Sequence, residues 1–121
     1  MNREEVITYI KEYFGVEGES LWAKFPNYLV FRNARNRRWF GLVGDVERGK
    51  LGFSGEGKVD LLVIRCDPLM VGSLVQTGGA YLPAYHMNKK NWVSVLLDDS
   101  ADSEEVKNLI ALAFEIINQS K

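Results

Sequence analysis

Four arginines lie within seven residues of one another, at Arg32, Arg35, Arg37 and Arg38. The arginine guanidinium is a planar fork of N–H donors that fits the oxygens of a phosphate group. Two explanations of this cluster stay open: a site for a polyanion, or a solvated turn that discourages edge-to-edge pairing of a sheet. The candidate nucleic-acid-binding residues, with the other basic residues included, are Lys24, Arg32, Arg35, Arg37, Arg38, Arg48, Lys50, Lys89 and Lys90.

A second group of polar and aromatic residues lies between Pro83 and Trp92, and its candidate ligand- or partner-binding residues are Tyr85, His86 and Asn88. Ordering such side chains in a loop costs conformational entropy, so some interaction must compensate for it. One explanation is structural: the side chains satisfy loop backbone groups while Trp92 fills the core beneath. The other is a site for a small molecule or a partner protein. We favour the structural explanation, because asparagine and histidine bond readily to nearby backbone groups.

The sequence contains no pattern of a known catalytic centre. The single cysteine, Cys66, lies in an apolar run and is expected to be a reduced, buried thiol. The single histidine, His86, is far from it along the chain, so no nucleophile–base pair is predicted. Glycines follow neither a phosphate-loop nor a nucleophile-elbow pattern. We therefore expect a protein that is not an enzyme and has no cofactor.

No cysteine or histidine group has metal-ligand spacing, so no metal site is predicted. Carboxylates on the first predicted helix, Glu4, Glu5 and Glu12, could gather hard cations weakly. Carboxylates at such spacings are common on any solvated helix, which makes this the weakest of the binding hypotheses.

Charge is distributed unevenly along the 121 residues, although the net charge is only -1. Residues 1–20 hold two bases and five acids, residues 24–50 seven bases and two acids, and residues 98–121 two bases and six acids. This asymmetry indicates a charged face, which suits a binding protein. The chain has no long apolar run and no signal-peptide pattern at its start, so a cytoplasmic protein without membrane contact is expected.

Three helices are predicted from their capping signals. Asn2, with Glu5 three residues later, predicts the start of the first helix, and Gly15 predicts its end. Two more helices are expected to begin after Asp67 and after Asp102, whose short carboxylates suit N-caps. The last helix carries one apolar stripe, made of Val106, Leu109, Ile110, Ala113 and Ile117.

Apolar and β-branched runs predict strands at residues 28–32, 39–46, 50–53, 59–66 and 92–97. Residues 33–38 then form a hairpin tip that carries arginines, and residues 80–91 form a loop. The run 59–66 is the most apolar and is expected at the centre of the sheet. Gly41 and Gly44 indicate a bulge or close packing of a helix on the sheet.

Short turns between the early strands favour antiparallel pairing, and strands grouped between helices favour an α+β fold. The prediction is one domain of residues 1–121. Its N- and C-terminal helices pack on an antiparallel sheet, and a short helix precedes the last strand.

Several segments also match a known sequence pattern. In chain order they are Leu21-Trp22-Ala23-Lys24-Phe25-Pro26, Val30-Phe31-Arg32, Arg38-Trp39-Phe40-Gly41-Leu42, Val59-Asp60-Leu61, Arg65-Cys66-Asp67-Pro68, and Leu82-Pro83-Ala84-Tyr85-His86-Met87-Asn88-Lys89 followed by Trp92. Together these segments resemble the MmcQ/YjbR-like family over most of the chain from Leu21 to Asp99.

The resemblance implies a CyaY-like α+β fold and the role proposed for that family, which is DNA binding by two hairpin wings. It supplies no catalytic residues. The arginine cluster corresponds to one wing, and Arg48 with Lys50 lies on the second turn. The glycine-rich turn at residues 55–57 is not basic. DNA is thus the first expected partner, and a protein or small ligand at the Tyr85–Lys90 loop is the alternative.

Overall fold

Helix α1 (Arg3–Phe14) begins and ends at the residues that its local signals predict. In the computed structural model, which describes residues 1–120, the Asn2 side chain accepts a hydrogen bond from the Glu5 N–H. The Glu5 carboxylate accepts one from the Asn2 N–H in return. This exchange satisfies two of the N–H groups that a helix start leaves free. Gly15 closes the helix at φ 65°, as the sequence predicted.

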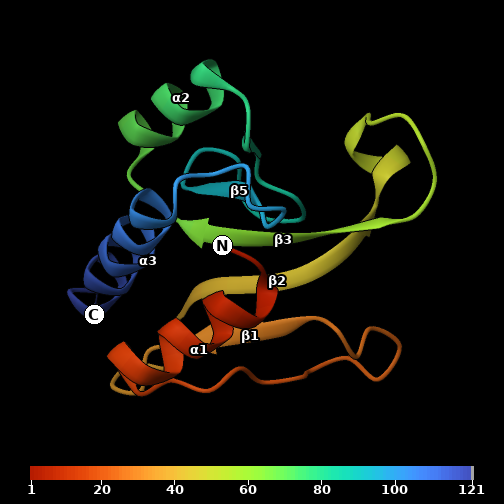
Figure 1. Ribbon diagram of the computed structural model, residues 1–121. Helices are drawn as coiled ribbons and strands as arrows, with labels where there is room; N and C mark the ends of the chain where they lie inside the picture. Colours follow the sequence, from red (N-terminus) through yellow and green to blue (C-terminus); the bar gives the residue numbers. More distant parts are fainter. Residues whose placement is uncertain (121) are drawn as a thin grey trace.

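Five strands form one sheet (Figure 1): β1 (Leu29–Arg32), β2 (Trp39–Glu47), β3 (Lys58–Arg65), β4 (Tyr81–Pro83) and β5 (Trp92–Leu96). Their spatial order is β1-β2-β3-β5-β4, and every neighbouring pair is antiparallel. The most apolar run, β3, occupies the centre, as predicted. The antiparallel α+β fold expected from the sequence is therefore confirmed.

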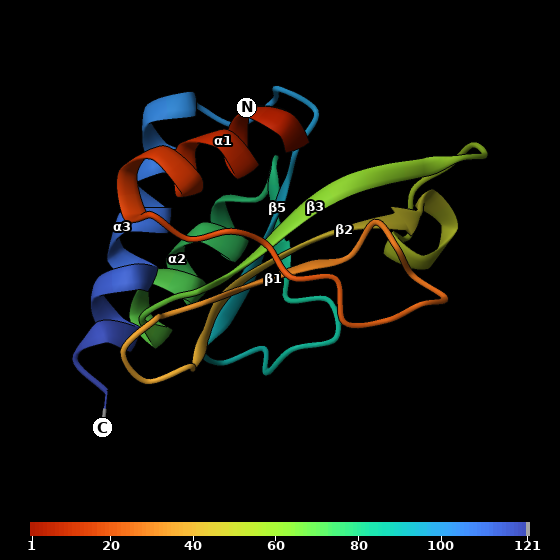
Figure 2. The same ribbon diagram turned by 90° about the horizontal axis from the view of Figure 1, so that it is seen from below.

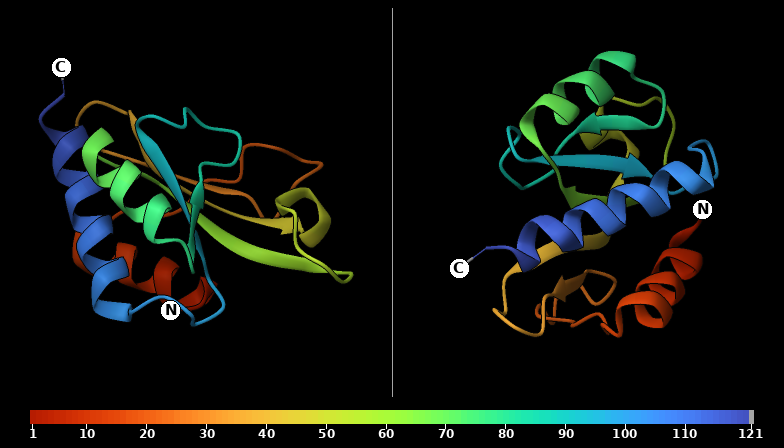
Figure 3. Two further views of the ribbon diagram at one scale, coloured as in Figure 1. Left: turned by 90° about the horizontal axis from the view of Figure 1, so that it is seen from above. Right: turned by 90° about the vertical axis from the view of Figure 1, so that its left-hand side faces the viewer.

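All three α-helices lie on one face of the sheet (Figure 2), which we call the helix face. Helix α3 (Ser103–Asn118) crosses the sheet between α1 and α2 (Pro68–Thr77), as the right panel of Figure 3 shows. Asp67 and Asp102 cap α2 and α3 as predicted. The predicted apolar stripe of α3 is buried, and its members are Val106, Leu109, Ile110, Ala113 and Ile117. Within residues 1–120, no helix has the length and apolar character needed to cross a membrane.

The other face of the sheet, which we call the open face, carries no α-helix of the described residues 1–120. Two irregular segments cross it instead, around residues 20–28 and 84–91 (Figure 2). A smaller apolar cluster lies beneath them, made of Val30, Leu42, Val63, Ala84 and Trp92. The burial of Trp92 agrees with the structural explanation of the residue 83–92 segment.

Two secondary-structure predictions were wrong. Residues 50–53 do not form a strand: Arg48–Leu51 is a 3-10 helix, η1, that ends at Gly52 with φ 80°. The backbone bonds of this turn are local, so no partner strand is needed there. Residues 80–91 are not wholly a loop, because β4 pairs with β5 at the sheet edge. A three-residue strand with a proline carries too weak a pattern to stand out from a loop.

A register shift between β1 and β2 decides which face two large rings occupy. Phe31 pairs with Gly41 and Arg32 with Trp39, so Phe40 is an extra residue on β2. Such a bulge interrupts the alternation of side chains between faces. Phe40 consequently packs on Phe114 of α3, while Trp39 packs on Trp22 on the open face.

Candidate ligand-binding groove

A groove lined by aromatic side chains lies on the open face, with a volume of about 400 Å³. We call it the aromatic groove. Three parts of the chain build it: the segment before β1, strand β2 with the η1 turn, and the loop after β4. Within residues 1–120 no carboxylate lines it, and its residues are Trp22, Phe25, Tyr28, Trp39, Leu42, Lys50, Tyr85, His86 and Met87.

One wall of the groove is a chain of ring contacts. The Trp22 ring meets the Trp39 ring edge to face at 6.0 Å and the Tyr28 ring at 6.3 Å. The Phe25 ring stacks on Tyr28 at 5.4 Å. Trp22 is 37% exposed and Phe25 54% exposed, so both rings keep free surface after these contacts. Exposed aromatic surface held by other rings is a rigid platform for a ligand.

The backbone holds this segment against the sheet edge. Glu19 and Val30 exchange two hydrogen bonds of 2.9 Å, which attach the segment to β1 just before the aromatic residues begin. Two turn bonds follow, from the Phe25 N–H to the Trp22 carbonyl and from the Tyr28 N–H to the Phe25 carbonyl. The aromatic wall is thus built on consecutive turns anchored to a strand.

Gly44 explains how the Tyr28 ring can lie against β2. A Cβ atom at Gly44 would meet two Tyr28 ring carbons at 2.8 Å, which is closer than side chains approach one another. The predicted bulge is present beside Gly41, where Phe40 is the extra residue. At Gly44 the close neighbour is the Tyr28 ring rather than a helix. Burial, with smaller contributions from Tyr85 and Asp45, raises the pKa of the Tyr28 phenol, which stays protonated at neutral pH.

The opposite wall comes from the loop that the sequence singled out. The backbone N–H of Tyr85 donates to the hydroxyl of buried Ser94 at 3.0 Å. His86 adopts φ 63°, a left-handed conformation that histidine tolerates better than most residues, and its ring lies 4.0 Å from that of Tyr85. Both rings line the groove. Asn88 serves the loop itself, since its side-chain oxygen accepts from the N–H groups of Lys90 and Asn91.

Lys50 is a cation shared by neighbouring hollows of this surface. It lines the aromatic groove and also a neighbouring depression of about 390 Å³ beside β4. The two hollows share Lys50, Tyr85 and His86. Within residues 1–120, no carboxylate forms an ion pair with Lys50. Lys89 lines the second hollow, where its ammonium donates to the Ala84 carbonyl at 2.9 Å.

The arginine hairpin contacts the end of α3. The Arg35 guanidinium donates to the carbonyls of Asn118 and Ser120, and the Asn36 amide donates to the Ile117 carbonyl at 2.7 Å. The last carbonyls of a helix have no partner within the helix, so these bonds cap α3. Arg35 is thereby committed to a structural contact 83 to 85 residues away along the chain.

The other predicted basic residues differ in how free they are. Glu19 pairs with both Arg32, at 3.2 Å, and Arg37, at 3.5 Å. Arg48 closes the η1 turn by donating to the Ser54 carbonyl and lies over the Phe53 ring. Lys24, Arg38 and Lys90 are exposed, and their side chains have no ion pair with other residues in the 1–120 range.

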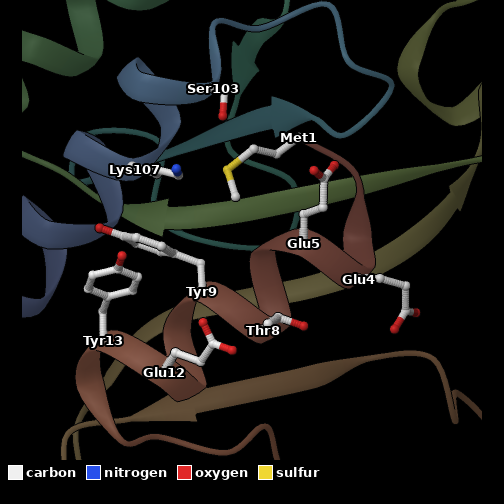
Figure 4. Close-up of a pocket in the computed structure, with 9 residues that line it drawn as sticks. All are labelled: Met1, Glu4, Glu5, Thr8, Tyr9, Glu12, Tyr13, Ser103 and Lys107. Atoms are coloured by element: carbon white, nitrogen blue, oxygen red, sulfur yellow. The ribbon is translucent and has the colours of Figure 1, made fainter.

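A further depression, between α1 and α3, is lined mainly by acidic and polar side chains (Figure 4). Its lining includes Glu4, Glu5 and Glu12, the carboxylates considered as weak cation ligands, together with Tyr13. Glu5 is already engaged in capping α1. Among the residues that the structure describes, no three histidine, cysteine or acidic side chains are grouped as metal ligands.

Cys66 is buried on the helix-face core. Burial raises the pKa of its thiol, so the thiol stays protonated and weakly nucleophilic at neutral pH. Tyr81, a further ring of the β4 region, does not reach the groove, because its hydroxyl bonds to the Glu105 carboxylate on α3.

The fold and this surface define a small α+β protein with an aromatic groove on an uncovered sheet face. The sequence model of the YjbR family matches residues 12–116. An uncharacterized protein of Bacillus subtilis, YyaQ, is 34% identical over 116 residues, which cover 96% of this chain and 98% of that protein. The chain belongs to the YjbR family, as its sequence segments indicated.

Solved structures agree with this assignment. A crystal structure of a Pseudomonas syringae protein superimposes with a TM-score of 0.92 at 36% identity, covering 97% of this chain and 99% of that one. A solution structure from Pseudomonas syringae gives 0.84 at 35% identity, with coverages of 97% and 93%. A Deinococcus radiodurans protein shares the fold at 20% identity, with a TM-score of 0.74 and coverages of 98% and 80%.

Proposed function

We propose that this YjbR-family protein is a non-catalytic binding module that holds a planar aromatic group of its ligand in the aromatic groove. The observation that carries the proposal is the free surface of Trp22 and Phe25, two rings braced by Tyr28 and Trp39 around a hollow of about 400 Å³. Hollows of this size, lined mainly by aromatic side chains with few polar groups, are typical of ligand sites.

The polar groups of the groove favour binding over turnover. Tyr28 is held protonated by burial, and Cys66 lies in the core away from the open face. General acid–base or nucleophilic chemistry needs an activated group within reach of the reacting atoms. Lys50 instead offers positive charge, and Lys50 and His86 both offer hydrogen bonds, which orient a ligand.

The three tryptophans supply the test. Trp22 and Trp39 line the groove, whereas Trp92 is only 8% exposed beneath the residue 84–91 loop. On titration with a neutral aromatic fragment such as benzamide, the indole N–H signals of Trp22 and Trp39 should shift in NMR spectra while that of Trp92 stays in place. Absence of any shift at millimolar fragment, or equal shifts of all three signals, would contradict the proposal.

A matched pair of variants localises the binding. Phe25→Ala removes a half-exposed ring of the groove and should weaken fragment binding severalfold. Tyr13→Ala removes a ring that is 71% exposed on α1, at the depression on the helix face, and should leave binding unchanged. Equal effects of the two substitutions would argue for nonspecific contact with exposed rings.

Duplex DNA binding by the hairpin is the second candidate, and the observation that favours it is the free guanidinium of Arg38 beside exposed Arg37. With Arg35 occupied at α3, we assign the phosphate contacts to three exposed cations, Lys24, Arg37 and Arg38, of which Arg37 would exchange its Glu19 partner for a phosphate. Neutralising about three phosphates predicts that log K falls with log salt at a slope of about -2.7.

Substitution of Arg37 and Arg38 by alanine should flatten that slope by about 1.8, because two phosphate contacts are lost. Arg35 is left intact in this experiment, since its loss would also uncap α3. Duplex titrations at low salt that show no binding, or an unchanged slope in the double variant, would remove this candidate.

A further inference from the structure

We infer that the ligand of the aromatic groove is a single-stranded nucleic acid, with a base stacked on the groove rings and its phosphate held by Lys50 and His86. This inference rests on the proposed function and names the chemistry of the ligand. Proteins that bind single strands combine stacking platforms with cations that follow the backbone. The open face brings both kinds of group together within one surface.

The charge of the groove lining favours an anionic ligand. Lys50 and His86 line the groove, and no carboxylate of residues 1–120 does. Asp45 and Glu47 line a smaller adjoining hollow of about 80 Å³, where Asp45 pairs with Lys58 at 4.0 Å. An anionic ligand is therefore favoured in the aromatic groove over the α1–α3 depression, whose lining holds three glutamates and one cation, Lys107 (Figure 4). A neutral aromatic ligand would leave the ammonium of Lys50 without a counter-charge, since it has no ion-pair partner within residues 1–120.

The combined extent of two adjoining hollows favours a strand over a mononucleotide. Two hollows, of about 400 and 390 Å³, meet at Lys50, Tyr85 and His86. This arrangement places one cation, the Lys50 ammonium, between two adjacent hollows. A nucleic-acid strand has the same succession, because a phosphate joins each nucleoside to the next. A free mononucleotide would use one hollow and leave the other empty, so a strand of at least two nucleotides fits better.

A base can reach the groove rings only when it is unpaired. The bases of a duplex are stacked and paired inside the helix, whereas those of a single strand can turn outward onto aromatic rings. Trp22 and Phe25 lie at the wall of a concave surface, where a base could stack only after leaving a duplex. The geometry thus favours single strands over duplexes.

Fluorescence anisotropy of a labelled hexanucleotide tests the inference, with the full chain at low salt. Thymidine and adenosine single strands should both bind. A duplex of the same length should bind more weakly by about tenfold or more. Phe25→Ala and Trp22→Ala should each reduce single-strand affinity by about tenfold, while Tyr13→Ala should not. Circular dichroism checks that each variant is folded. If one groove variant does not fold, the other still tests the site.

The phosphate contact has its own readout. Lys50→Gln should reduce the salt slope of single-strand binding by about 0.7, the contribution of one phosphate contact. Lys11→Gln, which removes an exposed lysine on α1, should leave the slope unchanged. An unchanged slope in Lys50→Gln would overturn the assignment of the phosphate to this site.

The remaining outcomes separate this inference from the proposed function. Equal affinity for single strand and duplex, or for a mononucleotide and the hexanucleotide, would overturn the single-strand assignment. Benzamide shifts at Trp22 without oligonucleotide binding would leave the proposed function standing and the nucleic acid excluded. Failure of both ligands would remove both proposals.

Discussion

Gly44 is required for the groove because it has no side chain. The Tyr28 ring occupies the space where a Cβ would stand, 2.8 Å from two ring carbons. Tyr28 in turn braces Trp22 and Phe25. The absence of a Cβ at Gly44 therefore makes room for the ring that braces the aromatic wall.

Gly44→Ala should displace the Tyr28 ring and weaken aromatic-fragment binding, with a loss of about 1–3 kcal/mol in the free energy of unfolding. Gly49→Ala is the matched control, since a Cβ there meets nothing within 4 Å. Fragment titration and urea unfolding measure the two effects. Unchanged binding in a folded Gly44→Ala protein would show that the Tyr28 position is not required.

Tyr81 makes a buried contact that depends on pH. Burial, followed by the hydrogen bond to Glu105, raises the pKa of its phenol above the ordinary value near 10. Above about pH 10 the unfolded chain releases this proton while the folded protein keeps it. The unfolded state then binds fewer protons, so the free energy of unfolding falls as pH rises.

Tyr81→Phe should remove this dependence, because phenylalanine has no proton to release. Between pH 10 and 11, the free energy of unfolding of the wild type should fall more steeply than that of the variant, by up to about 1.4 kcal/mol per pH unit. Parallel pH profiles for the two proteins would contradict the role given to the buried phenol.

At the scale of elements, the β1–β2 hairpin and the end of α3 form one structural unit. Arg35 and Asn36 donate to three α3 or post-α3 carbonyls, and the Asn33 amide donates to the Asn118 side chain at 3.1 Å. The hairpin tip is thereby held in place by the helix, and the helix end by the hairpin. One arginine of the cluster, Arg35, thus has a structural role at the helix end.

Arg35→Ala should lower the free energy of unfolding by about 1–2 kcal/mol, through loss of hydrogen bonds to helix-end carbonyls. Arg38→Ala on the same hairpin makes no such contact and should stay within about 0.5 kcal/mol of the wild type. Urea unfolding compares the two, and amide hydrogen exchange should accelerate in the last turn of α3 only in Arg35→Ala. Equal stabilities would contradict the capping role.

Element boundaries were predictable where the signal is local. The Asn2–Glu5 pair, the Asp67 and Asp102 caps and the stop at Gly15 each act within a few residues, and all lie where predicted. The η1 turn and β4 were missed because short irregular pieces carry little periodicity. Gly41 and Gly44 indicated a bulge, but its position at Phe40 depends on the register with β1, which the β2 sequence alone does not specify.

At the scale of the whole molecule, one sheet separates two surfaces of different purpose. The helix face holds the larger core, and the open face holds the smaller cluster with the groove above it. Central strands contribute side chains to both clusters: Ile64 to the first and Val63 to the second. Unfolding of one face would therefore expose the other.

We expect both faces to unfold in a single transition. Tryptophan fluorescence reports the open face, where Trp22, Trp39 and Trp92 all lie, and far-ultraviolet circular dichroism reports mainly the helices. The two urea curves should share one midpoint, as in two-state unfolding of a small domain. An earlier fluorescence transition would mean that the open-face segments detach before the core melts.

The sequence by itself determined the fold class, the helix starts and the central strand, because capping residues and apolar periodicity act over short stretches. The family followed from the resemblance of whole segments to a known pattern. Only the tertiary structure decided which basic residues are free and where the groove lies. Arg35 finds its carbonyl partners 83 to 85 residues away, and the groove joins Trp22 to Met87. Contacts between distant segments depend on register and packing, which no local pattern records.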